Sequence, residues 1–323
     1  MEFRTLGRTP LKVSRIALGT MTFGAQTDET AAFRMVDQSL EAGVNFFDTA
    51  NVYNQGESEE ILGKALRGHR EKVILATKVG MKAGEARDES GLSGAAIRRA
   101  IDASLKRLRT DYVDIYYLHQ PDYNTPVEEI LAEMDKLVCS GKIRYPAVSN
   151  FAAWQVAEIH CLAQKNAQLA PYVSQPMYNL IARGIEDEYL PFCKHYGVAV
   201  IAYNPLAGGL LTGKHHVGGG PASGTRFDKN QMYLDRYWHE GDFAAVEDLR
   251  NIAQESGISL VELAFQWLLS REAVDCILLG ASRLEQLLEN LKACQGVRLD
   301  PVIVDRCDAV WKQLRGISPK YNR

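Results

Sequence analysis

Short runs of hydrophobic residues alternate with amphipathic stretches from residue 16 to about residue 292. Eight runs have the length and composition of strands, and they cover residues 15–18, 44–47, 73–77, 112–118, 143–148, 172–174, 198–203 and 275–279. Helical spacing of apolar residues marks the stretches 30–42, 58–66, 93–108, 127–139, 154–165, 186–195, 243–255, 259–270, 284–291 and 302–314. Near-continuous apolar strands separated by helices predict an α/β protein with a parallel sheet buried on both faces.

The parallel sheet must be either a closed barrel or an open, doubly wound sheet. The open fold that binds dinucleotides has a G-x-G-x-x-G turn after its first strand, and no such motif follows residues 15–18. Eight βα units in 323 residues match a (β/α)8 TIM barrel. We therefore predict a single barrel domain over residues 1–323.

Two segments lie outside the regular alternation. Residues 2–15 contain two short β-like pieces around a turn with glycine and proline, which predicts an N-terminal β-hairpin that plugs the N-terminal end of the barrel. Residues 204–241, after the seventh strand, form the longest irregular segment and are rich in glycine. Loops of this length are usually lids, binding loops or disordered insertions. Its position after a barrel strand favours a functional loop, with a disordered insertion as the alternative.

Composition and charge narrow the class of partner. The formal net charge of −3 gives no long-range attraction to nucleic acid or to an anionic membrane. The first seven residues lack the apolar core of a signal peptide, and no apolar stretch approaches the ~18 residues that span a bilayer. The six cysteines are scattered, as is typical of free thiols in a reducing cytosol. We expect a cytoplasmic protein with neither a nucleic-acid nor a membrane partner; the sequence does not indicate its oligomeric state.

Four polar residues follow the second, third and fourth predicted strands. Asp48, Lys78 and His119 come directly after residues 44–47, 73–77 and 112–118, and Tyr53 lies five residues beyond Asp48. The C-terminal ends of barrel strands meet at one rim, and that rim carries the chemistry in such barrels. We therefore expect these four side chains to converge there.

The chemistry of these four residues suits proton donation to a carbonyl oxygen. A phenol with a pKa near ~10 is a poor acid, and we expect the Lys78 ammonium to make the Tyr53 proton easier to give. Asp48 would keep Lys78 charged, and His119 would hydrogen-bond the oxygen that Tyr53 protonates. Taken singly, each residue has a structural alternative as a turn former, a packed ring or a solvated charge; their convergence favours catalysis.

Four segments carry a resemblance to a known family. Residues 48–59 resemble the D-T-A-x-x-Y-G-x-S-E motif of the aldo-keto reductases, and residues 76–78 resemble their A-T-K strand. Residues 111–122 are similar to the D-Y-I-D-L-Y-x-x-H-x-P-D stretch, and residues 141–150 are similar to G-K-I-R-x-x-G-V-S-N. The resemblance runs from about residue 3 to residue 292 in the same order and spacing.

The resemblance implies a barrel that reduces an aldehyde or ketone to an alcohol by direct hydride transfer from NADP(H). The catalytic tetrad of the family maps onto Asp48, Tyr53, Lys78 and His119, with Tyr53 as the general acid. Two alternatives remain: a non-catalytic NADPH-binding subunit that docks on a membrane channel, as in the potassium-channel β-subunit branch, and a Schiff-base aldolase that uses Lys78. No metal site is expected.

The resemblance also implies cofactor contacts. We expect the adenosine 2′-phosphate site after the eighth strand to favour NADPH over NADH. The nicotinamide and its ribose would contact Gly19, Thr20, Met21, Asp48, Ser149, Asn150, Gln175 and Tyr203. The pyrophosphate would lie under the S-P-L-A-x-G-L-L-T-G-K-like loop at Asn204, Pro205, Leu206, Gly209, Leu210 and Lys214. The adenosine 2′-phosphate and adenine would contact Gly280, Ser282, Arg283, Gln286, Glu289 and Asn290.

Three departures from the family motifs bear on the site. Pro146-Ala147 stands where an apolar residue and glycine are usual, Asn204 replaces serine, and Asn54-Gln55 replaces the glycine after the tetrad tyrosine. The substrate itself is not readable from the sequence. Aromatic and methionine side chains suggest an apolar mouth, or else they pack the long loop down; they are Met21, Phe23, Tyr53, Tyr233, Tyr237 and Trp238. His215 and His216, in the glycine-rich loop, are expected to be solvated.

Overall fold

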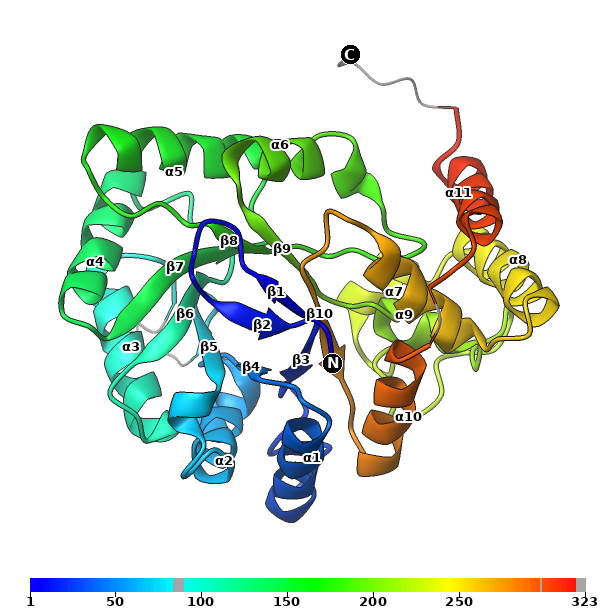
Figure 1. Ribbon diagram of the computed structural model, residues 1–323, viewed down its shortest axis with the longest axis horizontal. Helices are drawn as coiled ribbons and strands as arrows, with labels where there is room; N and C mark the ends of the chain where they lie inside the picture. Colours follow the sequence, from blue (N-terminus) through cyan, green and yellow to red (C-terminus); the bar gives the residue numbers. More distant parts are fainter. Residues whose placement is uncertain (84–89, 297, 318–323) are drawn as a thin grey trace.

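The protein is described from a computed structural model, which covers residues 1–83, 90–296 and 298–317. Eight parallel strands close into a barrel in the order in which they occur along the chain (Figure 1). This confirms the predicted (β/α)8 barrel. The barrel strands are β3 (Ile16–Gly19), β4 (Phe46–Asp48), β5 (Ile74–Val79), β6 (Val113–Leu118), β7 (Ile143–Ser149), β8 (Val173–Gln175), β9 (Ala199–Ala202) and β10 (Cys276–Gly280).

Helices surround the barrel and cover the outer face of its strands (Figure 1). Apart from α7, their bounds agree with the predicted helical stretches to within a few residues, because the apolar spacing that predicts a helix is the stripe that the helix buries. The helices are α1 (Glu29–Glu41), α2 (Glu57–Ala65), α3 (Gly94–Leu108), α4 (Val127–Cys139), α5 (Ala153–Lys165), α6 (Tyr189–Tyr196), α7 (Gln231–Tyr237), α8 (Glu240–Glu255), α9 (Leu260–Ser270), α10 (Leu284–Cys294) and α11 (Pro301–Arg315).

The N-terminal hairpin plugs one end of the barrel, as predicted. Strands β1 (Phe3–Thr5) and β2 (Lys12–Ser14) pair antiparallel and lie across the barrel opening in Figure 1. Leu6 and Val13 of the hairpin are fully buried against side chains of the barrel interior. The turn depends on Gly7, which has φ +51°, because a Cβ there would lie 2.6 Å from the carbonyl oxygen of Tyr172.

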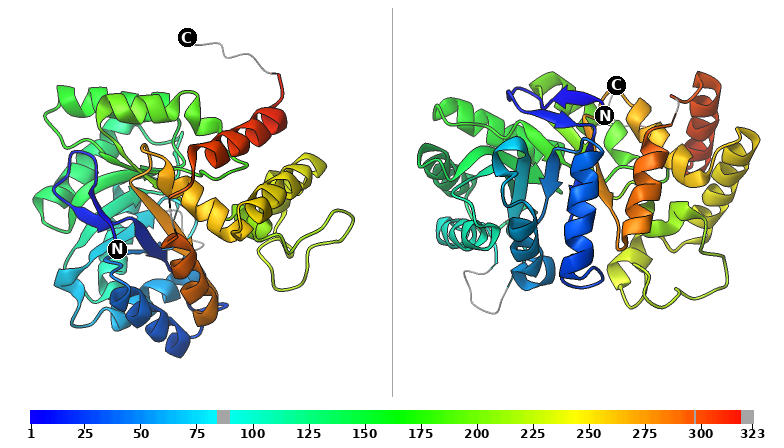
Figure 2. Two further views of the ribbon diagram at one scale, coloured as in Figure 1. Left: turned by 45° about the vertical axis from the view of Figure 1, so that its right-hand side comes forward. Right: turned by 60° about the horizontal axis from the view of Figure 1, so that its bottom comes forward.

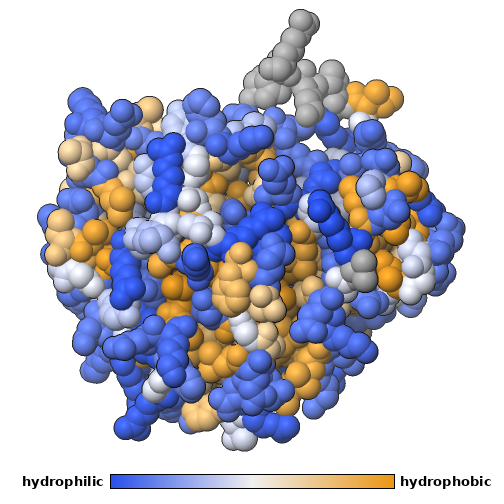
Figure 3. All heavy atoms as spheres, viewed as in Figure 1, coloured by the Kyte–Doolittle hydropathy of each residue, from blue (hydrophilic) through white to orange (hydrophobic). Residues whose placement is uncertain are grey.

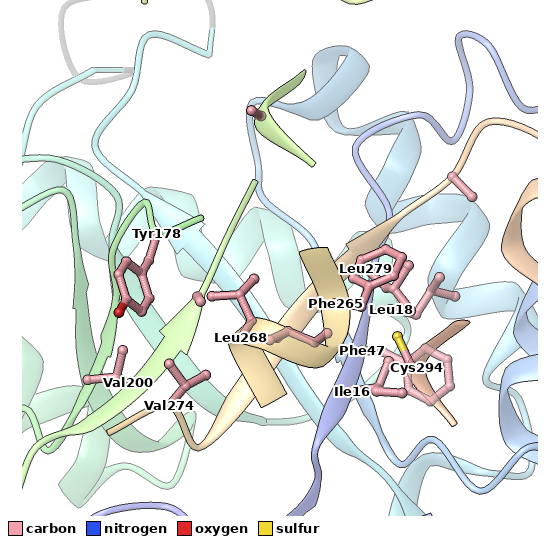
Figure 4. Packing of buried hydrophobic residues seen from close by; sticks show 14 of the residues in the cluster. Ile16, Leu18, Phe47, Tyr178, Val200, Phe265, Leu268, Val274, Leu279 and Cys294 are labelled. Atoms are coloured by element: carbon pink, nitrogen blue, oxygen red, sulfur yellow. The ribbon is translucent and has the colours of Figure 1, made fainter. Parts of the chain in front are cut away.

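Alternate residues of the strands face two different cores. Along β3, Ile16 and Leu18 pack outward against the helices, while Ala17 joins the smaller cluster inside the barrel. Figure 4 shows the outward layer, with Phe265 and Leu268 of α9 beside the strands. Each large apolar side chain buried in this way contributes about 1.5–3 kcal/mol to stability. The strands are buried on both faces, which explains why they form continuous apolar runs in the sequence.

The segment after β9 differs from the prediction. Residues 204–241 were expected to be irregular, yet they contain a 3-10 helix, η5 (Ala207–Thr212), and the helix α7. The side chain of Asn230 caps α7 by accepting a hydrogen bond from the backbone N–H of Tyr233, and Tyr233 and Tyr237 bury one face of this helix. With only seven residues, α7 is too short to give a clear periodic signal in the sequence.

The two ends of the barrel have different roles. In the side view of Figure 2 the hairpin lies at the top, and the segment after β9 extends from the bottom, where the barrel strands end. The face that carries the hairpin is covered mainly by hydrophilic side chains, with smaller hydrophobic patches between them (Figure 3). Among the described helices, none is both long and apolar enough to cross a bilayer.

Candidate active site

The four predicted catalytic residues meet at the rim opposite the hairpin. Asp48 is the last residue of β4, Lys78 lies near the end of β5, and His119 directly follows β6. Tyr53 begins the 3-10 helix η1 (Tyr53–Gly56), which lies between β4 and α2 along the chain. The parallel register pairs Asp48 with the residue two before Lys78, so that the two side chains reach the same level of the barrel. The predicted convergence is therefore observed.

The Lys78 amine is the centre of the hydrogen-bond network. It donates to the Asp48 carboxylate, to the carbonyl oxygen of Thr49 at 2.8 Å and to the Tyr53 hydroxyl at 3.4 Å. The second carboxylate oxygen of Asp48 accepts a hydrogen bond from Gln175 Nε2 at 2.9 Å. Lys78 and Asp48 are both fully buried. A buried ion pair persists only when its remaining polar atoms are also satisfied, and here the neighbours supply those partners.

The net pKa shift of Tyr53 is upward, opposite to the effect expected from its Lys78 neighbour alone. Burial raises the pKa of Tyr53 and outweighs the opposing effect of the Lys78 ammonium, while the Asp48 carboxylate raises the pKa further. Lys78 thus acts on Tyr53 in the expected direction, by lowering its pKa, but burial outweighs that effect in the free protein. Burial lowers the pKa of Lys78, but Asp48 and Tyr53 outweigh it, so that the net change is upward. The resting site thus holds a protonated phenol beside a stable ammonium.

His119 is a neutral imidazole at the side of Tyr53. The two ring centroids are 6.0 Å apart, with the rings nearly perpendicular. Burial and then the nearby Lys78 charge lower the pKa of His119 to about 3. Its Nδ1 atom is buried and has no hydrogen-bond partner in the described part of the chain. A proton there would be an unsatisfied donor, so the geometry favours the tautomer with the proton on Nε2.

The turn after Tyr53 explains how the chain tolerates Asn54-Gln55 where the family motif has glycine. Asn54 and Gln55 have φ values of 48° and 57°, in the left-handed region. Asparagine enters this region more readily than most residues, and here its side chain also stabilises the turn. Asn54 Nδ2 donates to the carbonyl oxygens of Met21 at 3.2 Å and Phe23 at 2.6 Å. The turn that carries Tyr53 is thereby tied to the loop after β3.

The residues expected around the nicotinamide form a connected layer beside the tetrad. Asn150, which is exposed, donates through Nδ2 to the carbonyl oxygen of His119 at 2.9 Å and accepts from the Tyr203 hydroxyl at 2.7 Å. Ser149 donates to the carbonyl oxygen of Gln175 at 2.9 Å. Because Gln175 already donates to Asp48, the cofactor layer and the proton-donating network share a residue.

The three residues after β3 divide into a buried part and an exposed part. Thr20 is fully buried, and its hydroxyl contacts Ser58 and the carbonyl oxygen of Asp48. Gly19 packs so closely that a Cβ would lie 3.1 Å from Leu278. Met21, by contrast, is 43% exposed at the mouth of the site. Of the two side chains here, that of Met21 is therefore the one that a ligand can reach.

The loop expected at the pyrophosphate is a tight turn with two glycines in the left-handed region. Asn204 (φ 62°) accepts a hydrogen bond through Oδ1 from the backbone N–H of Gly208 at 2.7 Å. Gly208 and Gly209 have φ values of 70° and 107°, which a side chain would not allow without strain. Pro205 and Leu210 are buried and Leu206 is half-buried, so these three residues anchor the loop in the protein interior.

Two observations show that this loop fits an anionic group. A Cβ added to Gly209 would lie 3.8 Å from the Lys214 amine, so this glycine lies directly beside an ammonium. Near the same point, His215 Nε2 is buried without a hydrogen-bond partner in the described residues. His215 is only 7% exposed, so the expectation that it is solvated is wrong. Its ring packs against Phe227 and Trp238 of the long loop, which the sequence pattern did not indicate.

The residues predicted to contact the adenosine end of the cofactor lie at the end of β10, in the turn after it and in α10. Ser282 donates its backbone N–H to Gln286 Oε1 at 3.0 Å. Arg283 is the N-cap residue of α10, and its side chain is exposed, as is that of Glu289. Asn290 is only 4% exposed and donates to the carbonyl oxygen of Gly280 at 3.5 Å. Asn290 therefore faces the turn from inside, whereas Arg283 is free to meet a phosphate.

Helix α7 carries Arg236 and Tyr237, and Trp238 directly follows it. The sequence pattern indicates no role for Arg236 and two alternative roles for Tyr237 and Trp238. Tyr237 is buried, and its hydroxyl accepts hydrogen bonds from Asn179 at 3.1 Å and Asn204 at 2.8 Å. Burial raises the pKa of Tyr203, and Arg236 lies close enough to oppose that effect. Tyr237 and Trp238 pack against other residues of the protein and hold the long loop in place. This is the second of the two alternatives for these aromatic rings. Arg236 carries no motif in the sequence, because a lone arginine is an ordinary surface residue.

Comparisons with known proteins point the same way as the geometry. A model of the Aldo/keto reductase family matches residues 15–312. The chain is 38% identical to a probable voltage-gated potassium channel subunit beta of Oryza sativa subsp. japonica, over 96% of each chain. It is 37% identical to the uncharacterized oxidoreductase YrpG of Bacillus subtilis (strain 168), over 99% of each chain. It is 36% identical to aflatoxin B1 aldehyde reductase member 2 of Homo sapiens, over all of this chain and 94% of the human one.

Proposed function

Because the chain belongs to the aldo/keto reductase family, we propose that it is an NADPH-dependent carbonyl reductase that converts an aldehyde or ketone to an alcohol. The observation that carries the proposal is the Tyr53 hydroxyl, 3.4 Å from a buried Lys78 amine that is itself paired with Asp48. When bound, the reduced nicotinamide supplies the hydride. Everything else that the reaction needs is a proton at the carbonyl oxygen and a surface that orients the two reactants.

Proton donation is the task of Tyr53. The resting phenol holds its proton firmly, so transfer occurs only as the carbonyl oxygen gains negative charge and becomes a strong base. The phenolate that remains is stabilised by the Lys78 ammonium, which Asp48 keeps charged and fixed. Neutral His119 directs a hydrogen bond at the same oxygen, which orients the carbonyl without competing for the proton.

Cofactor binding is assigned to three groups of residues. Asn150 and Gln175, in the layer beside the tetrad, would hold the carboxamide, and Tyr203 would pack on the nicotinamide ring. Lys214 would meet the pyrophosphate. Arg283 offers an exposed guanidinium for the adenosine 2′-phosphate, which supports NADPH rather than NADH as the cofactor.

Replacing Tyr53 with phenylalanine tests the assignment of the acid. We expect Tyr53→Phe to lower kcat by roughly 10²–10⁴-fold, the usual contribution of a general acid, because the ring remains and the proton donor is lost. The Kd for NADPH should stay within about twofold. Activity is followed as the loss of NADPH absorbance at 340 nm with a panel of aliphatic and aromatic aldehydes and ketones. A folded wild-type protein that binds NADPH but reduces no carbonyl in the panel would refute the proposal.

A Schiff-base aldolase that uses Lys78 is the weaker alternative. A lysine acts as a nucleophile only when its amine is neutral. Asp48 and Tyr53 raise the pKa of Lys78 despite its burial, so the amine is held as an ammonium. Borohydride trapping with an aldehyde gives the direct test, since covalent labelling of Lys78 would support the aldolase.

A second candidate function follows from the rice relative, whose name describes a channel subunit. This chain would then bind NADPH and dock on a membrane protein without turning over substrate. The two functions separate in one experiment with the purified wild-type protein. Carbonyl turnover that Tyr53→Phe abolishes supports the reductase, whereas NADPH binding without turnover, together with retention of a membrane protein in a pull-down, supports the subunit.

A further inference from the structure

His215 is a buried polar residue for which the proposed reaction has no use. It follows Lys214, and its ring packs edge-on against two aromatic side chains of the long segment after β9, which also contact each other. The ring centroids lie 5.1 Å from Phe227 and 5.3 Å from Trp238, at interplanar angles of 80° and 70°. Its Nε2 atom is buried and makes no hydrogen bond within the described ranges. A buried polar group without a hydrogen bond costs about 1–3 kcal/mol. The unpaired Nε2 atom of His215 therefore indicates that a ligand completes its hydrogen bonding.

The surroundings of Nε2 indicate what that partner is. A Cβ built on Gly209 would lie 4.0 Å from His215 Nε2 and 3.8 Å from Lys214 Nζ, so the glycine, the imidazole and the ammonium meet at one point. The backbone N–H of Gly209 is already donated to the carbonyl oxygen of Leu206 at 2.8 Å. The free donors near this point are therefore side chains, an ammonium and an imidazole, and these suit a phosphate oxygen.

We infer that His215 is a phosphate-binding residue of the dinucleotide site, donating from Nε2 to a pyrophosphate oxygen beside Lys214. This inference rests on the proposed function, because it takes the dinucleotide as the ligand. Edge-on packing against Phe227 and Trp238 holds the ring in place before the ligand arrives, and a donor that is already oriented loses little entropy on binding. The exposed and flexible Lys214 supplies charge, and the fixed imidazole supplies direction.

The inference makes cofactor affinity depend on pH. Burial lowers the pKa of His215, and the neighbouring side chains of Lys214 and His216 lower it further. A phosphate beside the ring favours the charged form, so the pKa rises in the complex. By linkage, the complex binds more protons than the free protein, and affinity therefore increases as pH falls through the pKa of the complex. It levels off below the pKa of the free protein.

The experiment compares His215→Phe with His216→Phe. Phenylalanine keeps an aromatic ring packed against Phe227 and Trp238 but removes the donor, and the exposed neighbour His216 serves as the matched control. The Kd for NADPH is measured by fluorescence between pH 5.5 and pH 8.5. We expect His215→Phe to weaken binding by roughly tenfold or more at the acid end and by less at the alkaline end. His216→Phe should follow the wild type.

Two ligand fragments separate the phosphates. The 2′-phosphate monoester itself titrates near ~6, so the comparison is made as the ratio of variant to wild type at each pH, in which that titration cancels. ADP-ribose, which carries the pyrophosphate alone, should lose affinity in His215→Phe. Adenosine 2′-monophosphate, which carries no pyrophosphate, should bind both proteins equally. Equal loss for both fragments would overturn the assignment to the pyrophosphate.

The outcomes distinguish this inference from the proposed function. If the wild type binds NADPH and His215→Phe matches it in Kd and pH profile, the phosphate role is wrong and the reductase proposal stands. If the wild type binds no dinucleotide, both fall together. Should His215→Phe fail to fold, NMR titration of the wild-type His215 ring decides: a pKa that rises when ADP-ribose binds supports the role, and an unchanged pKa excludes it.

Discussion

At the scale of single residues, the site combines charges that are fixed with groups that are kept neutral. Lys78 and Asp48 form a fully buried ion pair, while Tyr53 and His119, directly beside it, stay uncharged. Burial opposes every charge, so only the pair that attracts each other remains ionised. The chemistry of the rim therefore depends on which groups touch one another, and less on their ordinary pKa values.

Removing one member of the ion pair should be more harmful than removing both. Lys78→Met leaves an uncompensated carboxylate in the core, and we expect it to lower the free energy of unfolding by about 3–5 kcal/mol. The double variant Asp48→Asn/Lys78→Met removes both charges and should regain much of that loss, although neither protein would reduce carbonyls. Urea unfolding measures both. Additive losses in the double variant would show that the two side chains are not energetically coupled.

His119 should remain uncharged across the assay range. Its pKa is lowered to about 3, against an ordinary value near ~6.5, so we expect the NMR signals of its ring to stay those of a neutral imidazole down to pH 5. The unfolded chain takes up a proton at this histidine where the folded chain does not. The free energy of unfolding should therefore decrease as pH falls below about 6.5. A His119 signal that titrates between pH 6 and pH 7 would contradict this assignment.

At the scale of elements, a buried arginine joins three parts of the chain. Arg183, in the loop after β8, is 3% exposed and lies over the ring of Trp267 in α9, 4.7 Å from its centroid. It donates to Glu186 from Nε at 2.9 Å and from a terminal nitrogen at 3.0 Å, and it pairs with Asp308 of α11 at 2.7 Å. The last helix, which lies beside α8 in Figure 1, is thereby tied to the barrel loops by a charged contact.

Breaking this contact should loosen the C-terminal helix selectively. We expect Arg183→Ala to lower the free energy of unfolding by roughly 2–3 kcal/mol, since Glu186 and Asp308 lose the nearer of two arginine partners, with Arg271 remaining, and the rings of Trp267 and Trp311 lose a neighbour. Hydrogen exchange should accelerate in residues 301–315, while NADPH binding is retained. The control is Arg306→Ala, which removes an exposed pair with Glu255 and should cost at most about 1 kcal/mol. Uniform acceleration over the whole chain would argue against a local role.

At the scale of the whole molecule, stability and chemistry occupy opposite ends of one barrel. The hairpin fills the N-terminal end with apolar side chains such as Leu6 and Val13. The C-terminal rim instead buries the Lys78–Asp48 pair. It also carries the segment after β9, in which Tyr237 is buried and Trp238 packs against Phe227. The parallel arrangement makes this division possible, because all eight strands deliver their C-terminal ends to the same side (Figure 2).

The sequence by itself determined the architecture and the convergence of the tetrad. Apolar runs of strand length, each followed by an amphipathic helix, predict a parallel sheet buried on both faces, and the count of eight units without a G-x-G-x-x-G turn favours the closed barrel over the open sheet. In that arrangement Asp48, Lys78 and His119 must share a rim. These conclusions follow from chain order and periodicity, which are local properties of the sequence.

Only the tertiary structure decided the properties that depend on contact between distant segments. The raised pKa of Tyr53 results from burial, and no spacing along the chain reveals how dry a site is. The glycine-rich sequence around His215 predicts a solvated residue, but the fold packs its ring against Phe227 and Trp238. Desolvation and hydrogen-bond partners are set by what the whole fold places around a side chain, so neither can be read from its immediate neighbours in the sequence.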